Sequence, residues 1–166
     1  DVAVASVAGL YDGTIIHELG HSAFGLADEY EYLEGCASGE ATQNTYAGTE
    51  PLEPNITIEP TALPGKWGLM IDAATPTPTT TNPNPATCDT QPSPVADGVI
   101  GTFEGAGHYH SGLYRPAFTC RMRDAEDDFC AVCSNVINIR VLADNPCFLA
   151  TAVYGDPFAP PVVALR

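Results

Sequence analysis

Apolar side chains recur at helical spacing near the start of the chain. They are Ile15, Ile16, Leu19, Ala23 and Phe24. Asp12 and Thr14 precede the pattern and are suitable N-cap residues, while Gly25 can end a helix because glycine readily adopts a positive φ. The pattern therefore predicts an amphipathic helix that carries His17 and stops near Gly25.

The segments on either side of this helix have different patterns. Residues 1–11 alternate Val and Ala with few polar groups, which favours a buried strand. Residues 36–98 are rich in Thr, Pro, Asn and Gly, and their centre at 75–85 cannot form a helix, so we expect an irregular surface loop. Trp67 lies within this loop and either anchors it to the core or lines a cleft; we favour the anchor.

Regular structure is expected to return near Val99. A second set of apolar residues at helical spacing comprises Phe129, Val132, Cys133, Val136, Ile137 and Val141. Asp124 is suited to cap this second helix, and Asn145-Pro146 would end it. The chain thus reads as an α+β fold with one helix near each end of its first 145 residues.

Length and charge limit the class of protein. The chain has 166 residues, of which 45% are apolar, so we expect one domain over residues 1–145 and a separate segment over 146–166. Six Lys and Arg against 21 Asp and Glu give a net charge of −15, which disfavours nucleic acids and anionic membrane surfaces as partners. No apolar run is long enough for a membrane span, and we expect a monomer. Both ends of the sequence suggest a fragment of a longer protein.

The chain contains six cysteines, an even number that favours disulfides and an oxidising compartment. The alternative is a second metal site or a redox pair built on Cys130-x-x-Cys133. We favour disulfides because no second CxxC or Cys/His pair stands at zinc spacing and no strand leads into the motif.

The segment His17-Glu18-Leu19-Gly20-His21 is an HExxH motif. Residues i and i+4 lie on one helix face, so both imidazoles can bind the same zinc ion. Glu18 follows the first histidine and can act as general base toward a water that zinc has acidified. The spacing therefore indicates a hydrolytic zinc site; the alternative is a structural helix that merely carries two histidines.

A catalytic zinc site usually has a third protein ligand. Gly25 can turn the chain out of the helix and bring Asp28 back toward the ion, which makes Asp28 our third ligand. Glu29 is an alternative because it is the adjacent carboxylate. His108 and His110 are further alternatives, although we expect them to be loop histidines near the cleft.

Four blocks of sequence resemble the IgA-specific metalloendopeptidases, a family of secreted bacterial zinc peptidases. The blocks are residues 17–30, 66–78, 103–123 and 129–133, and they occur in the right order within a match that extends from residue 1 to about 142. The resemblance implies a metzincin-like fold, a zinc cofactor, secretion, and a protein or peptide substrate. It also implies a methionine-containing turn beneath the metal.

The resemblance assigns roles to three more residues. Met122 matches the methionine of that turn, where a thioether provides an apolar floor under the imidazoles; ordinary core packing is the alternative. Tyr114 could donate its phenol to the developing oxyanion, against a plain packing role. Arg115 could meet a substrate carboxylate, but we expect it to pair with one of the many acidic residues.

Two features depart from the general metzincin pattern. Gly25 stands four residues after His21 where three are usual, and the extra residue turns the helix exit by about 100°, which leaves Asp28 and Glu29 both open as ligands. In addition, metzincin-like peptidases have a sheet-bearing subdomain before the active-site helix, and only eleven residues precede Asp12.

The remaining cysteines and the C-terminal segment complete the expectations. Cys36 with Cys88 would join the two ends of the Thr/Pro-rich loop, and Cys120 with Cys130 or Cys133 would clamp the methionine turn to the second helix. Residues 147–166 resemble the CFI-box segment found at the ends of assorted exported bacterial proteins.

These observations lead to one expected function and two alternatives. We expect a secreted zinc endopeptidase in which His17, His21 and Asp28 hold zinc and Glu18 acts as general base. One alternative is a non-catalytic metal-binding structural or binding module. The other is a zinc hydrolase that acts on a non-peptide amide or a glycan-linked substrate.

Overall fold

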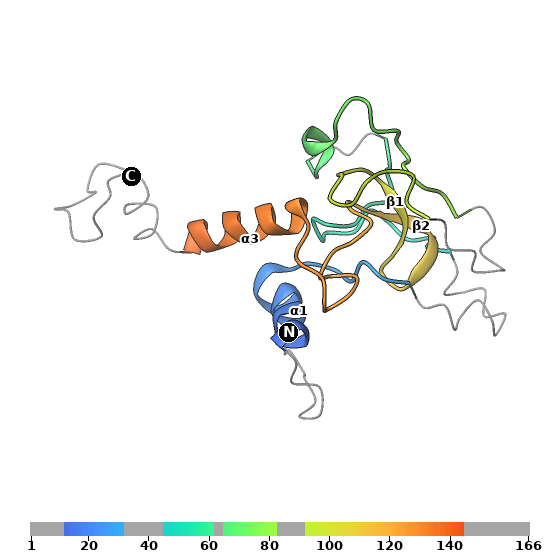
Figure 1. Ribbon diagram of the computed structural model, residues 1–166. Helices are drawn as coiled ribbons and strands as arrows, with labels where there is room; N and C mark the ends of the chain where they lie inside the picture. Colours follow the sequence, from blue (N-terminus) through green and yellow to red (C-terminus); the bar gives the residue numbers. More distant parts are fainter. Residues whose placement is uncertain (1–11, 32–44, 62–64, 83–91, 145–166) are drawn as a thin grey trace.

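The computed structural model describes residues 12–31, 45–61, 65–82 and 92–144 (Figure 1). Its elements are the helix α1 (Asp12–Phe24), the short 3-10 helix η2 (Gly68–Met70), the strands β1 (Phe103–Ala106) and β2 (Tyr109–Arg115), and the helix α3 (Ala131–Asp144). This content confirms the α+β class. The strand predicted for residues 1–11, the pair Cys36 and Cys88, and the segment 146–166 lie outside the described residues.

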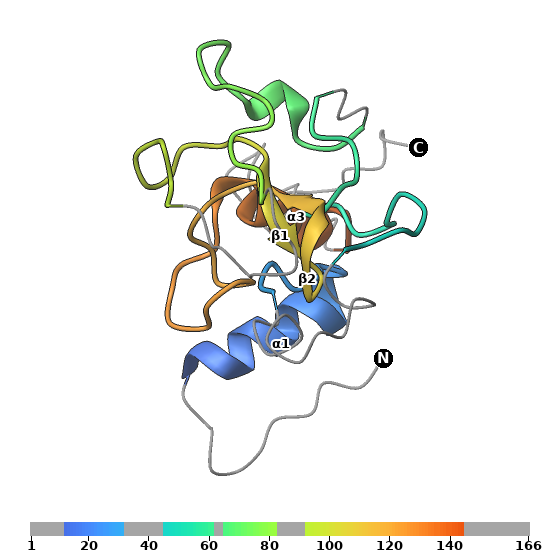
Figure 2. The same cartoon turned by 90° about the vertical axis from the view of Figure 1, so that its right-hand side faces the viewer.

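The two strands form an antiparallel hairpin in which Phe103 pairs with Arg115 and Glu104 with Tyr114. Long irregular segments border the hairpin and pair with it at single bridges, for example Thr57 with Tyr114 and Thr80 with Phe103. Figures 1 and 2 show α1 on one side of the hairpin and the segment 65–82 on the opposite side. Apart from η2, the described part of the predicted loop is irregular, as expected.

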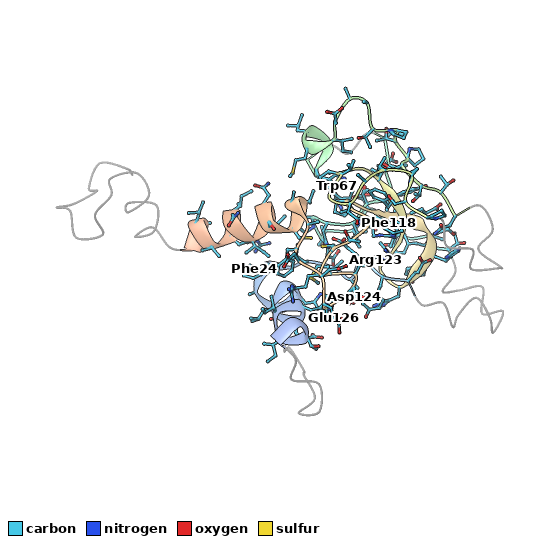
Figure 3. All side chains as sticks on the ribbon, viewed as in Figure 1. Phe24, Trp67, Phe118, Arg123, Asp124 and Glu126 are labelled. Atoms are coloured by element: carbon cyan, nitrogen blue, oxygen red, sulfur yellow. The ribbon has the colours of Figure 1, made fainter. Side chains whose placement is uncertain are left out.

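The first helix is present as predicted, but its apolar side faces outward. Ile15, Ile16 and Leu19 are 38%, 41% and 45% exposed, whereas His17 and Gly20 are buried. Helical spacing identifies residues that share a face, but it does not say which face packs inward. Phe24, at the end of α1 beside α3 (Figure 3), packs against the core.

The exit from α1 explains how the extra residue before Gly25 is accommodated. Gly25 adopts a φ of 65°, in the left-handed region that favours glycine. Its N–H donates to the carbonyl of His21, and the N–H of Leu26 donates to the carbonyl of Gly20, both at 3.0 Å. The first bond is that of a common glycine-terminated helix end, whereas the second spans one residue more than its usual counterpart, which gives a wider turn.

The second helix begins later than predicted. It starts at Ala131, and Asp124 caps a separate turn (Figure 3) by accepting hydrogen bonds from the N–H groups of Glu126 and Asp127. An aspartate satisfies nearby backbone donors equally well in a turn, so its side chain alone does not identify a helix start. The predicted end near residue 145 agrees with the observed end at Asp144.

The main core lies between α1, α3 and the segments on either side of the hairpin. Its buried members are Leu26, Trp67, Ile100, Ala117, Cys120, Met122, Cys130, Val132 and Cys133. Trp67 is 2% exposed and donates its indole N–H to the carbonyl of Gly101 at 2.8 Å (Figure 3). The prediction that Trp67 anchors its loop to the core is therefore confirmed. None of the described helices combines the length and apolar character that a membrane crossing requires.

Candidate metal centre

Two histidines of α1 and one aspartate from the following segment converge beside the helix. The Nε2 atoms of His17 and His21 lie 3.2 Å apart. Asp28 Oδ1 lies 3.0 Å from the first of these nitrogens and 3.1 Å from the second. All three ligand-type atoms thus face a common point, which is the arrangement that the HExxH spacing predicts.

The spacing of these atoms fits a tetrahedral metal. Zinc binds imidazole nitrogen at roughly 2.0–2.1 Å, so two ligand atoms on a zinc tetrahedron are about 3.3 Å apart. The three observed separations, from 3.0 to 3.2 Å, are close to that value. Two imidazoles and one carboxylate are also a chemically suitable donor set for catalytic zinc.

The other ring nitrogen of each histidine is fixed by the backbone. His17 Nδ1 donates to the carbonyl of Arg121 at 2.8 Å, and His21 Nδ1 donates to the carbonyl of Leu26 at 2.7 Å. A carbonyl can only accept, so in the neutral imidazoles the proton sits on Nδ1 and the lone pair is on Nε2. In this tautomer the Nε2 atom of each ring could serve as a metal ligand.

Asp28 is held from two sides by residues that sequence reasoning did not assign to this role. Its Oδ2 lies 2.9 Å from Nε2 of His108, a turn residue with a φ of 73°. Asn55 accepts from the N–H of Ala27 and donates to the carbonyl of that residue, both at 2.8 Å, which fixes the backbone before Asp28. His108 was expected near the cleft, but Asn55 lies in an irregular loop and has no sequence signal.

Met122 lies directly under the turn of α1 that carries the two histidines. The side chain is fully buried, and a Cβ placed on Gly20 would be only 2.5 Å from its sulfur. Gly20, between the two histidines, therefore makes room for the thioether. A glycine at the second variable position of the HExxH motif signals this close approach. Sequence reasoning did not assign Gly20 a role.

The remaining predicted residues lie around this cluster at different distances. Glu18 is half-buried on α1, and its charge acts on His21. Tyr114 lies on β2 opposite Glu104, where burial and that carboxylate raise the pKa of the phenol to about 12. Arg115 is buried and donates to the backbone carbonyls of Glu104 and Gly105. The sequence predicted that it pairs with an acidic side chain; the charges of Glu29 and Glu31 act on it, but its hydrogen bonds among the described residues go to these carbonyls. His110 is buried on β2 and pairs with Glu31.

The hydrogen bonds within the cluster shift the ionisation of its members. The hydrogen bond with Asp28 raises the pKa of His17 above its usual value and raises the pKa of His21 to about 9. Burial opposes ionisation of Asp28, but hydrogen bonds from both histidines hold the pKa of its carboxyl well below the usual range. The carboxylate therefore stays charged, and protons compete with a metal ion for the imidazoles.

A cavity of about 460 Å³ opens beside the cluster. His21, Asp28 and His108 form the edge that faces the candidate metal position. The rest of its wall is largely apolar and aromatic and includes Tyr46, Ile56, Tyr109 and Leu113. A chain segment with an apolar side chain could occupy this space next to the reacting group.

Glu29 points away from the two histidines, and its carboxylate joins a different cluster. Its Oε1 lies 3.1 Å from Cys133 Sγ, and the ligand atoms of Cys120 and Cys130 lie nearby. All three of these cysteines are free, and the Sγ atoms of Cys120 and Cys133 are 3.7 Å apart, so the predicted disulfide between Cys120 and Cys130 or Cys133 is wrong. Sequence spacing could not reveal that a carboxylate joins the three thiols in one cluster.

Comparison with known proteins identifies the family of the chain. The sequence matches the family model described as IgA Peptidase M64 over residues 3–91 and 91–141. A comparison with curated proteins finds no significant match. Membership of this family implies a metallopeptidase, and the described residues contain a cluster able to bind a metal. The chain belongs to the IgA peptidase M64 family.

Proposed function

We propose that this chain is a zinc-dependent endopeptidase in which His17, His21 and Asp28 bind the metal. The observation that carries the proposal is the convergence of two Nε2 atoms and one carboxylate oxygen within 3.2 Å of one another. Asp28 is preferred over Glu29 as the third ligand because Glu29 points toward the cysteines. A metzincin-like arrangement, with Met122 as the floor of the site, accompanies this proposal.

When bound, zinc supplies a Lewis acid that acidifies water and polarises a peptide carbonyl. Glu18 lies next to the first histidine and accepts the proton of the attacking water, then returns it to the leaving amine. His108 holds the second oxygen of Asp28 and so fixes the carboxylate that faces the imidazoles. The cavity edged by His21, Asp28 and His108 accepts an apolar side chain of the substrate.

Tyr114 is proposed as the donor that stabilises the oxyanion. A tyrosine phenol is protonated at neutral pH, as a hydrogen-bond donor must be, and in this structure it is hydrogen-bonded to Glu104, which substrate would have to displace. Tyr109 serves as a matched comparison because it lies on the same strand and lines the cavity. Loss of turnover in Tyr114→Phe but not in Tyr109→Phe supports this role; the opposite result transfers it to Tyr109.

The substrate class follows from the family, and the export of the protein is part of the same proposal. A peptidase acts on a protein or peptide, and the resemblance to secreted peptidases favours an extracellular location. The described cysteines do not add to that argument, because Cys120, Cys130 and Cys133 are free.

Replacement of the general base tests the mechanism. In the full-length protein, Glu18→Gln should lower cleavage of a protein substrate by at least about 100-fold, since general bases contribute roughly 10²–10⁴ to the rate. Bound zinc, measured by metal analysis, should stay unchanged because Glu18 is not a ligand. Glu126→Gln is the control, as this exposed carboxylate lies in a turn and should leave both quantities at the wild-type level.

Two outcomes would contradict the proposal. Undiminished cleavage by Glu18→Gln would reject this residue as the base. Absence of cleavage in the zinc-loaded wild type across a peptide library would instead favour the non-catalytic metal-binding module. Cleavage of only non-peptide amides or glycan-linked substrates would favour the second alternative.

A further inference from the structure

A second group of potential metal ligands lies in the core, apart from the two histidines. Glu29, Cys120, Cys130 and Cys133 are all buried, and one ligand atom from each lies within 4.8 Å of all the others. They come from three segments: the residues after α1, the residues after β2, and the start of α3. The described cysteines are therefore gathered at one point, together with a carboxylate.

The distances suit a shared metal ion better than a covalent bond between sulfurs. Bonded sulfurs are about 2.0 Å apart, whereas Cys120 Sγ and Cys133 Sγ are separated by 3.7 Å. Zinc–sulfur bonds of about 2.3 Å place two sulfurs of a tetrahedron about 3.8 Å apart. The observed separation thus equals an edge of such a tetrahedron, and Glu29 Oε1, 3.1 Å from Cys133 Sγ, supplies a neighbouring corner.

The carboxylate of Glu29 has one oxygen that the described residues leave unsatisfied. Its side chain is 0% exposed, and Oε2 makes no hydrogen bond within the described part of the chain. Asn55 Nδ2 donates to Oε1 at 2.9 Å and so orients the group without serving the second oxygen. A buried carboxylate without full compensation is costly, and a cation between it and the thiols would supply that compensation.

The surroundings favour ionised sulfur at Cys130, where hydrogen bonds from Cys120 and Cys133 lower the thiol pKa. The same contacts and burial raise the thiol pKa of Cys120 and Cys133, so ionisation of these two depends on the positive charge of the metal. Cys130 immediately precedes α3 and Cys133 lies in its first turn, so both sit at the positive end of the helix dipole. The N–H of Cys130 donates to Cys120 Sγ at 3.4 Å. The buried guanidinium of Arg115 acts on both Glu29 and Cys120, which offsets part of the negative charge of three thiolates and one carboxylate around a divalent ion.

We propose that Glu29, Cys120, Cys130 and Cys133 form a second, closed zinc site with a structural role. Three thiolates and one carboxylate fill a tetrahedron and leave no position for water, which is the property of structural rather than catalytic zinc. Binding would release to solvent whatever protons the three thiols and the Glu29 carboxyl carry in the metal-free protein. This proposal does not depend on peptidase activity.

The second site would also brace the first. Glu29 follows Asp28 directly, and its N–H donates to the carbonyl of Met122 at 2.6 Å. Cys120 lies two residues before Met122, which contacts the turn that carries the two histidines. A metal bound by Glu29 and Cys120 would therefore fix the backbone next to both Asp28 and Met122. The buried cluster thus holds together the same segments that the predicted disulfide was expected to clamp.

Metal analysis of the full chain tests the proposal directly. Wild-type protein produced with added zinc should contain two zinc ions per chain, and the double variant His17→Ala/His21→Ala should retain one. After replacement of zinc by cobalt, the double variant should still show thiolate-to-cobalt charge-transfer absorption. The proposal would be overturned if the wild type bound only one zinc and the cobalt-loaded double variant showed no such absorption. A disulfide between any two of the three cysteines in non-reducing peptide mapping would also overturn it.

A conservative ligand variant separates metal binding from folding. Glu29→Gln preserves shape and should weaken the second zinc by at least about tenfold in a chelator competition. Ser134→Ala, one residue beyond Cys133 in α3, is the matched control and should keep both ions. Equal zinc retention in the two variants would mean that Glu29 is not a ligand. None of these measurements uses cleavage as a readout, so failure of the proposed peptidase activity would leave their result intact.

Discussion

The histidine cluster and the cysteine cluster differ in solvent access although consecutive residues contribute to them. Asp28 turns toward two partly exposed imidazoles at the edge of a 460 Å³ cavity. Glu29 turns toward three buried thiols and is itself fully buried. One cluster therefore borders an open cavity, whereas the other groups four buried potential ligands. The comparison teaches that carboxylates of similar chemistry take different roles according to the side of the backbone on which they lie.

The largest expected effects come from replacing each carboxylate by its amide, which tests whether the two clusters have different roles. Asp28→Asn should reduce cleavage by at least about 100-fold with a small change in stability, because it weakens the open site. Glu29→Gln should lower the free energy of unfolding of the zinc-loaded protein by at least about 1.4 kcal/mol, because zinc that binds tenfold more weakly stabilises the fold by that much less. Denaturant unfolding and cleavage per folded molecule measure the two effects.

If both variants lost activity and stability in the same proportion, the division between an open and a closed site would be wrong. A smaller loss of cleavage per folded molecule in Glu29→Gln than in Asp28→Asn is the expected pattern.

A more moderate effect is expected from the glycine that separates the two histidines. Gly20→Ala would push a methyl group into Met122, and overpacking of this kind costs roughly 1–3 kcal/mol. The displaced turn should also weaken zinc binding at the histidines, without changing the cobalt–thiolate absorption of the cysteine cluster. Ser22→Ala on the exposed side of the same helix is the control and should stay within about 0.5 kcal/mol of wild type.

The smallest effect concerns pH and should appear only in the metal-free protein. The pKa of His21 is raised from 6.5 to about 9 in the folded state, so its contribution to stability is complete below pH 6.5 and is lost as the pH rises through about 9. Asp28 has the opposite sign: its lowered pKa stabilises the fold above pH 3.8, and that contribution is lost only in stronger acid. Thermal melts in chelator should therefore show a falling midpoint between pH 6.5 and 9.

His21→Gln should flatten that decline, and zinc should reverse it, since metal affinity rises as the imidazoles lose their protons. A midpoint that rises over the same interval in the chelated wild type would contradict the assigned hydrogen bond between His21 and Asp28.

Local patterns predicted the helix α1, its end at Gly25 and the convergence of two histidines, because all three depend on residues close in sequence. They did not reveal which side of α1 packs inward: Ile15, Ile16 and Leu19 are exposed, while Gly20 packs on Met122. Burial is decided by segments about a hundred residues away, and helical spacing contains no information about them.

The cysteine cluster shows the same limit more sharply. The sequence favours disulfides over a metal motif at Cys130-x-x-Cys133, because no second pair stands at zinc spacing. Its partners are a single cysteine and a single glutamate, which form no recognisable interval. The start of α3 was misplaced for a related reason, because Asp124 serves a turn rather than the helix.

The number of residues between Gly25 and Glu29 determines which acidic side chain reaches each cluster. Adjacent residues there point to opposite sides, so deletion or insertion of one residue would send the wrong acid to each cluster. A point substitution in this stretch should weaken one cluster, whereas a change in its length should disrupt both. Directed evolution of this protein should therefore tolerate new side chains in this stretch far more readily than a new number of residues.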